Sequence, residues 1–107
     1  ACLASRIPYG EEITAEKLER IEAAEEFLRD HGFGQVRVRV HGPLARIEVE
    51  PAAMERLFAM RAEVVRAFED LGFVYVTLDL RGFRSGSMDA VHSPRASAET
   101  GDRQNAA

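Results

Sequence analysis

Two stretches of the chain alternate strictly between apolar and polar residues. Positions 36–41 alternate valine with arginine or histidine, and positions 45–50 alternate apolar with charged residues, on either side of a His-Gly-Pro turn at 41–43. This period of two predicts a β-hairpin, because successive side chains of a strand point to opposite faces. Positions 74–80 repeat the alternation and predict a third strand.

Two other stretches place apolar residues at helical spacing. The first helix is expected to begin after Thr14, a typical N-cap, and to end at Gly32, with an apolar stripe of Leu18, Ile21, Ala24, Phe27 and Leu28. The second is expected to begin at Pro51 and to end at Gly72. Its predicted buried stripe is Met54, Leu57, Phe58, Val64, Val65, Phe68 and Leu71.

The order of these elements predicts an α+β fold with an α-β-β-α-β layout. We expect a three-stranded, mostly antiparallel sheet covered on one face by two helices, with the first strand between the other two, as in half of a ferredoxin-like fold. Residues 1–13 form a lead-in and residues 14–89 the domain. Residues 90–107 contain almost no large apolar side chains and are expected to form a disordered tail.

Composition narrows the expected partners. The 107 residues include 18 acidic and 14 basic side chains, giving a formal net charge of −4 and no electrostatic case for nucleic acid. No apolar run approaches the roughly 18 residues that span a bilayer, so no membrane partner is expected. The one cysteine excludes an internal disulfide or a site built from several thiolates within this segment, and favours a reducing cytoplasmic location.

The polar face of the predicted sheet is the first candidate for chemistry. Arg37 and Arg39 lie two residues apart on one face and could clamp an anion, while Glu48 nearby could hold a metal or orient a substrate. The ordinary interpretation is a face left in water, where Arg–Glu pairs across strands are common decoration.

A second candidate is the lead-in, with Cys2. A lone cysteine is usually a small buried hydrophobe. However, Arg6 follows four residues later and could favour the thiolate. The segment Arg-Gly-Phe-Arg-Ser-Gly-Ser at 81–87 could present backbone N–H groups to an anion, although such a stretch is more often an ordinary loop.

Several segments together resemble one enzyme family: CLASRIPYGEEIT, EKLERIEAAEEFLR, VRVR, ARIEV and LGFVYVTLDLRGFRSGSM. They are similar to the C-terminal half of the ATP-dependent sacrificial sulfur transferases of the LarE type, which act in nickel-pincer nucleotide cofactor biosynthesis. The resemblance covers about residues 1–89. Phe83 stands where tyrosine is usual.

The resemblance implies a reaction and a set of site residues. An N-terminal pyrophosphatase-loop domain, absent from this chain, would bind ATP and Mg²⁺ and adenylylate a carboxylate of pyridinium-3,5-biscarboxylic acid mononucleotide. The Cys2 thiolate would then attack that carboxylate, release AMP and give up its sulfur, leaving dehydroalanine. Phosphate contacts are implied for Ser5, Arg6, Arg37, Arg39 and Arg84, a catalytic role for Glu48, and metal binding for Glu25 and Glu48.

The expected partners are therefore the mononucleotide substrate, the missing ATP domain and further copies of the chain in a homo-oligomer. This chain by itself is expected to be inactive. The alternative is a non-catalytic ligand-binding or oligomerisation module, in which the sheet face packs on another subunit and Cys2 is incidental.

Overall fold

A computed structural model describes residues 3–83, so Cys2, Arg84 and the expected tail at 90–107 lie outside the described residues. The elements are η1 (Leu3–Arg6), α1 (Ala15–Asp30), β1 (Val36–His41), β2 (Leu44–Val49), η2 (Pro51–Ala53), α2 (Met54–Ala59), α3 (Arg61–Asp70) and β3 (Tyr75–Leu78). They form the predicted α+β fold.

Helix α1 begins and ends as the sequence predicts. Thr14 is its N-cap, and the Thr14 hydroxyl accepts a hydrogen bond of 3.1 Å from the Lys17 N–H. At the other end Gly32 adopts a φ of 94°, and the Phe33 N–H donates back to the Leu28 carbonyl at 3.1 Å. This closure directs Phe33 into the core, where it is 1% exposed.

The predicted second helix is instead divided. Pro51 opens a short 3₁₀ turn, and Met60, with φ −98° and ψ 17°, separates α2 from α3. The expected stripe is also not buried throughout. Leu57 is buried, whereas Phe58 is 62% exposed, so the prediction of one continuous buried stripe is wrong.

The strand order also differs from the prediction. The sheet runs β1-β2-β3, with β2 antiparallel to β1 and parallel to β3, so β2 and not β1 is central. One physical reason lies at the outer edge of β1, where the Val38 N–H donates to the Glu25 carboxylate of α1 at 2.9 Å. The Glu25 carboxylate thus accepts the hydrogen bond that the backbone of a further strand beside β1 would need.

Strand β3 is shorter than predicted. It ends at Leu78, and the flanking Val74 and Leu80 are 62% and 82% exposed. The alternation at 74–80 predicts that both side chains face the core, so the prediction is wrong for these two residues. Thr77, on the other face, donates its hydroxyl to the Ala45 carbonyl at 2.8 Å.

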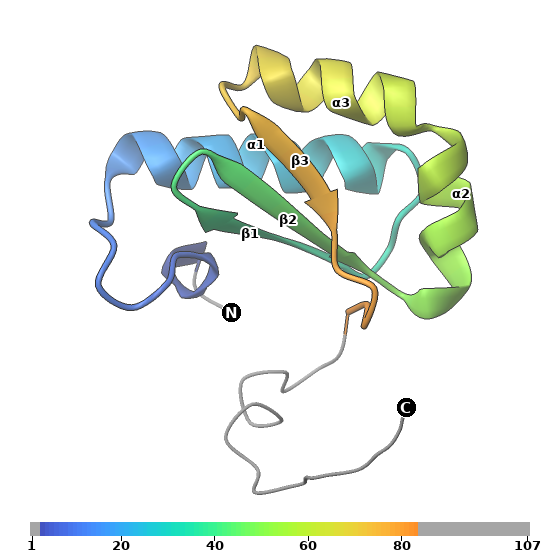
Figure 1. The fold of residues 1–107 in the computed structure, drawn as a ribbon, viewed down its shortest axis with the longest axis horizontal. Helices are drawn as coiled ribbons and strands as arrows, with labels where there is room; N and C mark the ends of the chain where they lie inside the picture. The colour runs from blue at the N-terminus through green and yellow to red at the C-terminus, as the bar shows by residue number, and fades with distance from the viewer. Residues whose placement is uncertain (1–2, 84–107) are drawn as a thin grey trace, which may run out of the picture.

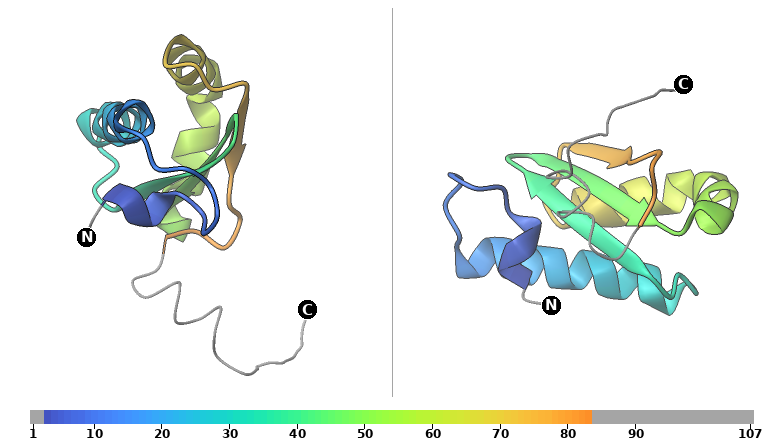
Figure 2. Two further views of the ribbon diagram at one scale, coloured as in Figure 1. Left: turned by 90° about the vertical axis from the view of Figure 1, so that its left-hand side faces the viewer. Right: turned by 90° about the horizontal axis from the view of Figure 1, so that it is seen from below.

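Two layers result from this arrangement. Helices α1 and α3 lie on one side of the sheet, and η1 lies beside β1 and α1 at the sheet's edge (Figures 1 and 2). The core between the layers includes Ile21, Leu28, Phe33, Ile47 and Phe68, each almost fully buried. Among residues 3–83 no helix combines the length and apolar character needed to cross a membrane.

The lead-in is fastened to the hairpin turn. The Glu11 carboxylate accepts a hydrogen bond from the Gly42 N–H at 3.1 Å and pairs with the Lys17 ammonium at 2.9 Å. These contacts hold residues 3–11 over the β1 side of the sheet, which brings η1 close to the polar face.

Candidate functional site

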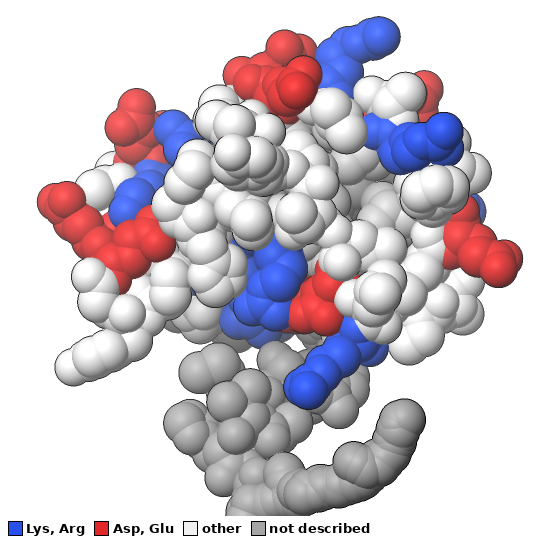
Figure 3. All heavy atoms as spheres, in the orientation of Figure 1, with Lys and Arg blue, Asp and Glu red and all other residues white. Residues whose placement is uncertain are grey.

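The polar face of the sheet is not simply left in water. Glu48 is 4% exposed, and the Arg39 side chain beside it is 12% exposed. Figure 3, in the orientation that places α1 behind the sheet, shows acidic and basic side chains packed together in the middle of this face. The expectation of ordinary solvated decoration is therefore wrong for its centre.

Glu48 lies between two arginines of the hairpin. Arg39 donates from Nε and Nη2 to the two Glu48 oxygens at 3.3 and 3.4 Å. Arg46 approaches Glu48 Oε2 at 3.4 Å and donates to Asp79 at 2.6 Å. These pairs link β1, β2 and the residue that follows β3, so the orientation of Arg39 depends on residues of β2 and on Asp79.

A second ion pair lies at the outer edge of β1. The Arg6 guanidinium donates from Nε and Nη2 to the two Glu25 oxygens at 2.9 and 3.1 Å, and both side chains are buried. Removing one partner of a buried pair leaves an uncompensated charge and costs about 3–5 kcal/mol. Glu25 and Arg6 therefore hold η1 against α1.

Ser5 joins the two ion pairs. Arg6 Nη1 donates to the Ser5 hydroxyl at 3.2 Å, and Arg39 Nη1 donates to the Ser5 carbonyl at 3.1 Å. The structure thus brings together the predicted residues Ser5, Arg6 and Arg39 from η1 and β1.

Arg37 has a different environment from its neighbour two residues along. Among residues 3–83 it forms no ion pair; Nη1 donates to the Val36 carbonyl at 3.3 Å, and the guanidinium lies 5.1 Å from the centre of the Phe83 ring. Burial lowers the pKa of Arg37, and the positive charge of Arg6 lowers the pKa further. The group stays charged because arginine titrates far above neutral pH.

Positive charge exceeds negative charge in this cluster. Within the described residues five guanidinium groups lie in this cluster with three carboxylates, which leaves two units of positive charge: Arg6, Arg29, Arg37, Arg39 and Arg46 against Glu25, Glu48 and Asp79. A surplus guanidinium near other cations is stabilised by an added anion, and the planar fork of arginine suits phosphate.

The predicted metal ligands do not fit a metal ion. Both oxygens of Glu25 and both oxygens of Glu48 already accept charged hydrogen bonds from arginine. In the part of the chain that the structure describes, no group of three or more His, Cys, Asp or Glu side chains could hold an ion. The metal prediction therefore finds no support in residues 3–83.

Arg46 and Asp79 are polar positions of the alternating stretches at 45–50 and 74–80, but neither they nor Phe83 are among the predicted site residues. For Arg46 a signal existed in the hairpin register, which places it opposite Arg39. Asp79 and Phe83 carried no local signal, since their roles depend on how the chain turns after β3.

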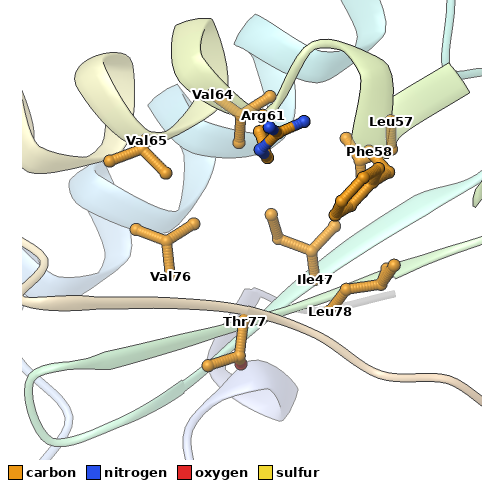
Figure 4. Close-up of a pocket in the computed structure, with 9 residues that line it drawn as sticks. All are labelled: Ile47, Leu57, Phe58, Arg61, Val64, Val65, Val76, Thr77 and Leu78. Carbon is orange, nitrogen blue, oxygen red and sulfur yellow. The ribbon is translucent and has the colours of Figure 1, made fainter.

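A hollow of about 300 Å³ lies on the other side of the sheet, between β3 and the break that separates α2 from α3. Figure 4 shows apolar side chains of these elements facing one another across it, with Thr77 pointing away. The arginine cluster contributes none of the residues that line it. The hollow is therefore separate from the candidate anion site.

Comparison with known proteins gives relatives of high similarity. No protein-family profile matches the chain. It is 50% identical over 92 residues to an uncharacterized protein of Synechocystis, and 38% identical over 84 residues to one of Methanocaldococcus jannaschii. It is 46% identical over 87 residues, or 81% of its length, to the pyridinium-3,5-bisthiocarboxylic acid mononucleotide synthase of Lactiplantibacillus plantarum.

These matches cover 84% and 78% of this chain for the two uncharacterized proteins. The chain spans about a third of the length of each curated relative, between 32% and 34%. The chain is thus similar, over most of its own length, to one part of a synthase that makes a thiocarboxylated mononucleotide.

Proposed function

We propose that this chain is the sulfur-donating and substrate-binding part of a sulfur transferase in nickel-pincer cofactor biosynthesis. The proposed substrate is pyridinium-3,5-biscarboxylic acid mononucleotide, carried as an adenylylated carboxylate. The observation that carries the proposal is the arginine cluster beside η1, with its surplus positive charge, in a chain 46% identical to a synthase of a thiocarboxylated mononucleotide.

In this proposal Arg37, Arg39 and Arg6 provide the positive field for the substrate phosphate. Arg37 is the group that would contact it most directly, because its guanidinium is not neutralised by a carboxylate within residues 3–83. Glu48 orients Arg39, since it accepts hydrogen bonds from Nε and Nη2 of that residue. Ser5 and Arg84 complete the proposed phosphate contacts, Arg84 from outside the described residues.

The proposed sulfur donor is Cys2, which immediately precedes η1 in the sequence. Its thiolate attacks the activated carboxylate and AMP leaves with the electron pair of the broken bond. Loss of the Cys2 α-proton then breaks the Cβ–S bond, so the sulfur stays on the substrate as thiocarboxylate and the side chain becomes dehydroalanine. We assign activation by ATP and Mg²⁺ to a separate domain; homo-oligomer formation and a cytoplasmic location stay predictions.

The decisive measurement is the mass of the peptide that contains Cys2, after the longer protein with its ATP-binding domain has turned over ATP and the biscarboxylic mononucleotide. We expect this peptide to lose about 34 Da, the elements of hydrogen sulfide. A reaction without ATP and a Cys2→Ser variant are the controls and should show no loss. An unchanged peptide beside a sulfur-containing product would reject Cys2 as the donor.

The second candidate, a ligand-binding or oligomerisation module, is favoured by the exposed apolar side chains near β3, including Val74, Tyr75 and Leu80. It predicts burial of these side chains in a complex and no chemistry at Cys2. Unchanged Cys2 together with no sulfur in the product would favour this module over the transferase.

A further inference from the structure

The buried carboxylate of Glu25 has three donors from two other segments. Arg6 donates from Nε at 2.9 Å and from Nη2 at 3.1 Å, and the Val38 backbone N–H donates at 2.9 Å. Arg29, four residues along α1, adds a longer approach of 3.6 Å from the solvent side. Glu25 itself is 1% exposed. Burying a carboxylate this deeply has a large desolvation cost. Ion pairing and hydrogen bonds offset that cost for Glu25.

The position of these donors indicates what the carboxylate does. Arg6 belongs to η1, the segment that follows Cys2, and Val38 lies between Arg37 and Arg39 on β1. One side chain of α1 therefore holds both the segment next to the thiol and the strand that carries the arginine pair. The same oxygen, Oε2, accepts from Arg6 Nε and from the Val38 N–H, so the two segments cannot shift independently while both bonds persist.

A second contact closes this arrangement. Arg39 donates to the Ser5 carbonyl at 3.1 Å, so η1 and β1 are joined directly as well as through Glu25. The Ile7 N–H donates to the Ala4 carbonyl at 3.1 Å, and Ile7 is 7% exposed in the core beside η1. Glu25 thus lies at the junction of three elements, a location expected of a residue that fixes geometry.

We propose that Glu25 is a positioning residue whose carboxylate sets the place of η1 relative to the arginine pair of β1. For catalysis this inference rests on the proposed function, in which Cys2 must reach a carboxylate on a substrate whose phosphate binds the arginines. For the fold it stands independently, because the contacts of Arg6 and Val38 with Glu25 do not depend on any substrate. A misplacement of about 1 Å is enough to slow a positioned reaction roughly 100-fold.

The variant Glu25→Gln keeps the size of the side chain and one acceptor oxygen but removes the negative charge that binds Arg6. Glu26→Gln makes the same chemical change on the next residue, which is exposed. Hydrogen exchange in the full chain is measured at two amides, Ile7 beside η1 and Phe33 at the end of α1. We expect Glu25→Gln to speed exchange at Ile7 at least about tenfold more than it speeds exchange at Phe33, while Glu26→Gln changes neither.

Two results of that measurement would overturn the proposal. Exchange at Ile7 equal to that of Glu26→Gln would mean that Glu25 does not hold η1. A matching rise at Ile7 and Phe33 would mean that Glu25 acts on the stability of the whole domain. If Glu25→Gln does not fold, Glu25→Asp takes its place, because it keeps the charge and shortens the reach by one methylene, and the same two outcomes apply.

The catalytic arm uses the longer protein with its ATP-binding domain. We expect Glu25→Gln to lower the single-turnover rate of sulfur loss from Cys2 at saturating substrate at least about tenfold, with KM changed by less than about threefold. A rise in KM at unchanged rate would contradict positioning of the donor segment. If the wild-type protein loses no sulfur from Cys2, the proposed function fails, whereas the hydrogen-exchange result still decides the role of Glu25 in holding η1.

Discussion

Arg37 and Arg39 share a strand face, yet the fold gives them different partners. Arg39 is held by Glu48 and by the Ser5 carbonyl, whereas Arg37 lies on the Phe83 ring. The two side chains therefore do not form the symmetric clamp that their spacing suggests. One is fixed by ion pairing, and the other keeps its charge available for an anion.

Asp79 provides a test of the ion pairs at the residue scale. Burial by itself raises the pKa of Asp79, but hydrogen bonds from the Arg81 N–H and the Arg46 guanidinium outweigh that effect, so the pKa lies below its ordinary value of 3.8. A carboxyl with a lowered pKa in the folded state stabilises the fold above its unfolded pKa. That stability is lost as the pH falls through the lower, folded pKa.

We therefore expect Asp79→Asn to reduce the free energy of unfolding at pH 7, and the difference from wild type to shrink as the pH falls below 3.8. Urea unfolding across this range measures it. Asp70→Asn, a change at an exposed aspartate, is the control. A difference that is the same at neutral and acid pH would show that the charge of Asp79 is not the cause.

At the scale of elements, the segment after β3 determines where Phe83 lies. The Gly82 N–H donates to the Asp79 carbonyl at 3.0 Å, and the Phe83 N–H donates to the Val49 carbonyl at 2.7 Å. This turn lays the chain across the end of β2 and delivers Phe83 to Arg37. It depends on Gly82, which has a φ of 82°.

Gly82→Ala should destabilise the domain by about 1–3 kcal/mol, because φ is positive and because an added Cβ would lie 2.8 Å from the Val49 carbonyl oxygen and 2.9 Å from Met54 Cε. Thermal and urea unfolding measure the loss. Gly34→Ala is the matched control, since a Cβ there meets nothing within 4 Å. Equal stability of the two variants would refute the close approach at Gly82.

The whole molecule separates two kinds of surface. The charged site lies on the polar face of the sheet with η1 at its β1 edge, while the hollow between β3 and the two short helices is lined mainly by apolar side chains. The break at Met60 leaves Phe58 at the rim of that hollow, whereas Phe68 packs fully in the core between the layers. Two phenylalanines of one predicted stripe thus have opposite environments.

Phe68→Ala should lower the free energy of unfolding by about 3–5 kcal/mol, because the side chain is 0% exposed and its removal leaves a cavity. Phe58→Ala should change the free energy of unfolding by about 0.5 kcal/mol or less, since Phe58 is 62% exposed. Urea unfolding of the two variants compares the same deletion at two sites. Similar losses would contradict the difference in burial between Phe58 and Phe68.

The sequence by itself determined the bounds of α1 and the faces of the hairpin. Thr14 marks the start of α1 and Gly32 marks its end. The alternation at 36–50 placed the valines on one face of the hairpin and the arginines on the other, because caps and periodicity are local properties of the chain. It also indicated Ser5, Arg6 and Arg39, which the structure brings together. Glu25 lies within the apolar stripe of α1, between Ile21 and Leu28, and that position was a signal of its burial.

Only the tertiary structure decided the strand order, the break at Met60 and the pairing of charges. Each depends on contacts between residues far apart in the chain, which no local pattern records. The Glu25 carboxylate binds the free edge of β1, which leaves β1 at the edge of the sheet and β2 in its centre. The turn at Gly82 brings Phe83 to Arg37. Burying an arginine or a carboxylate is favourable only when its partner is in place, so the character of the site depended on packing that brings η1, α1 and β1 together.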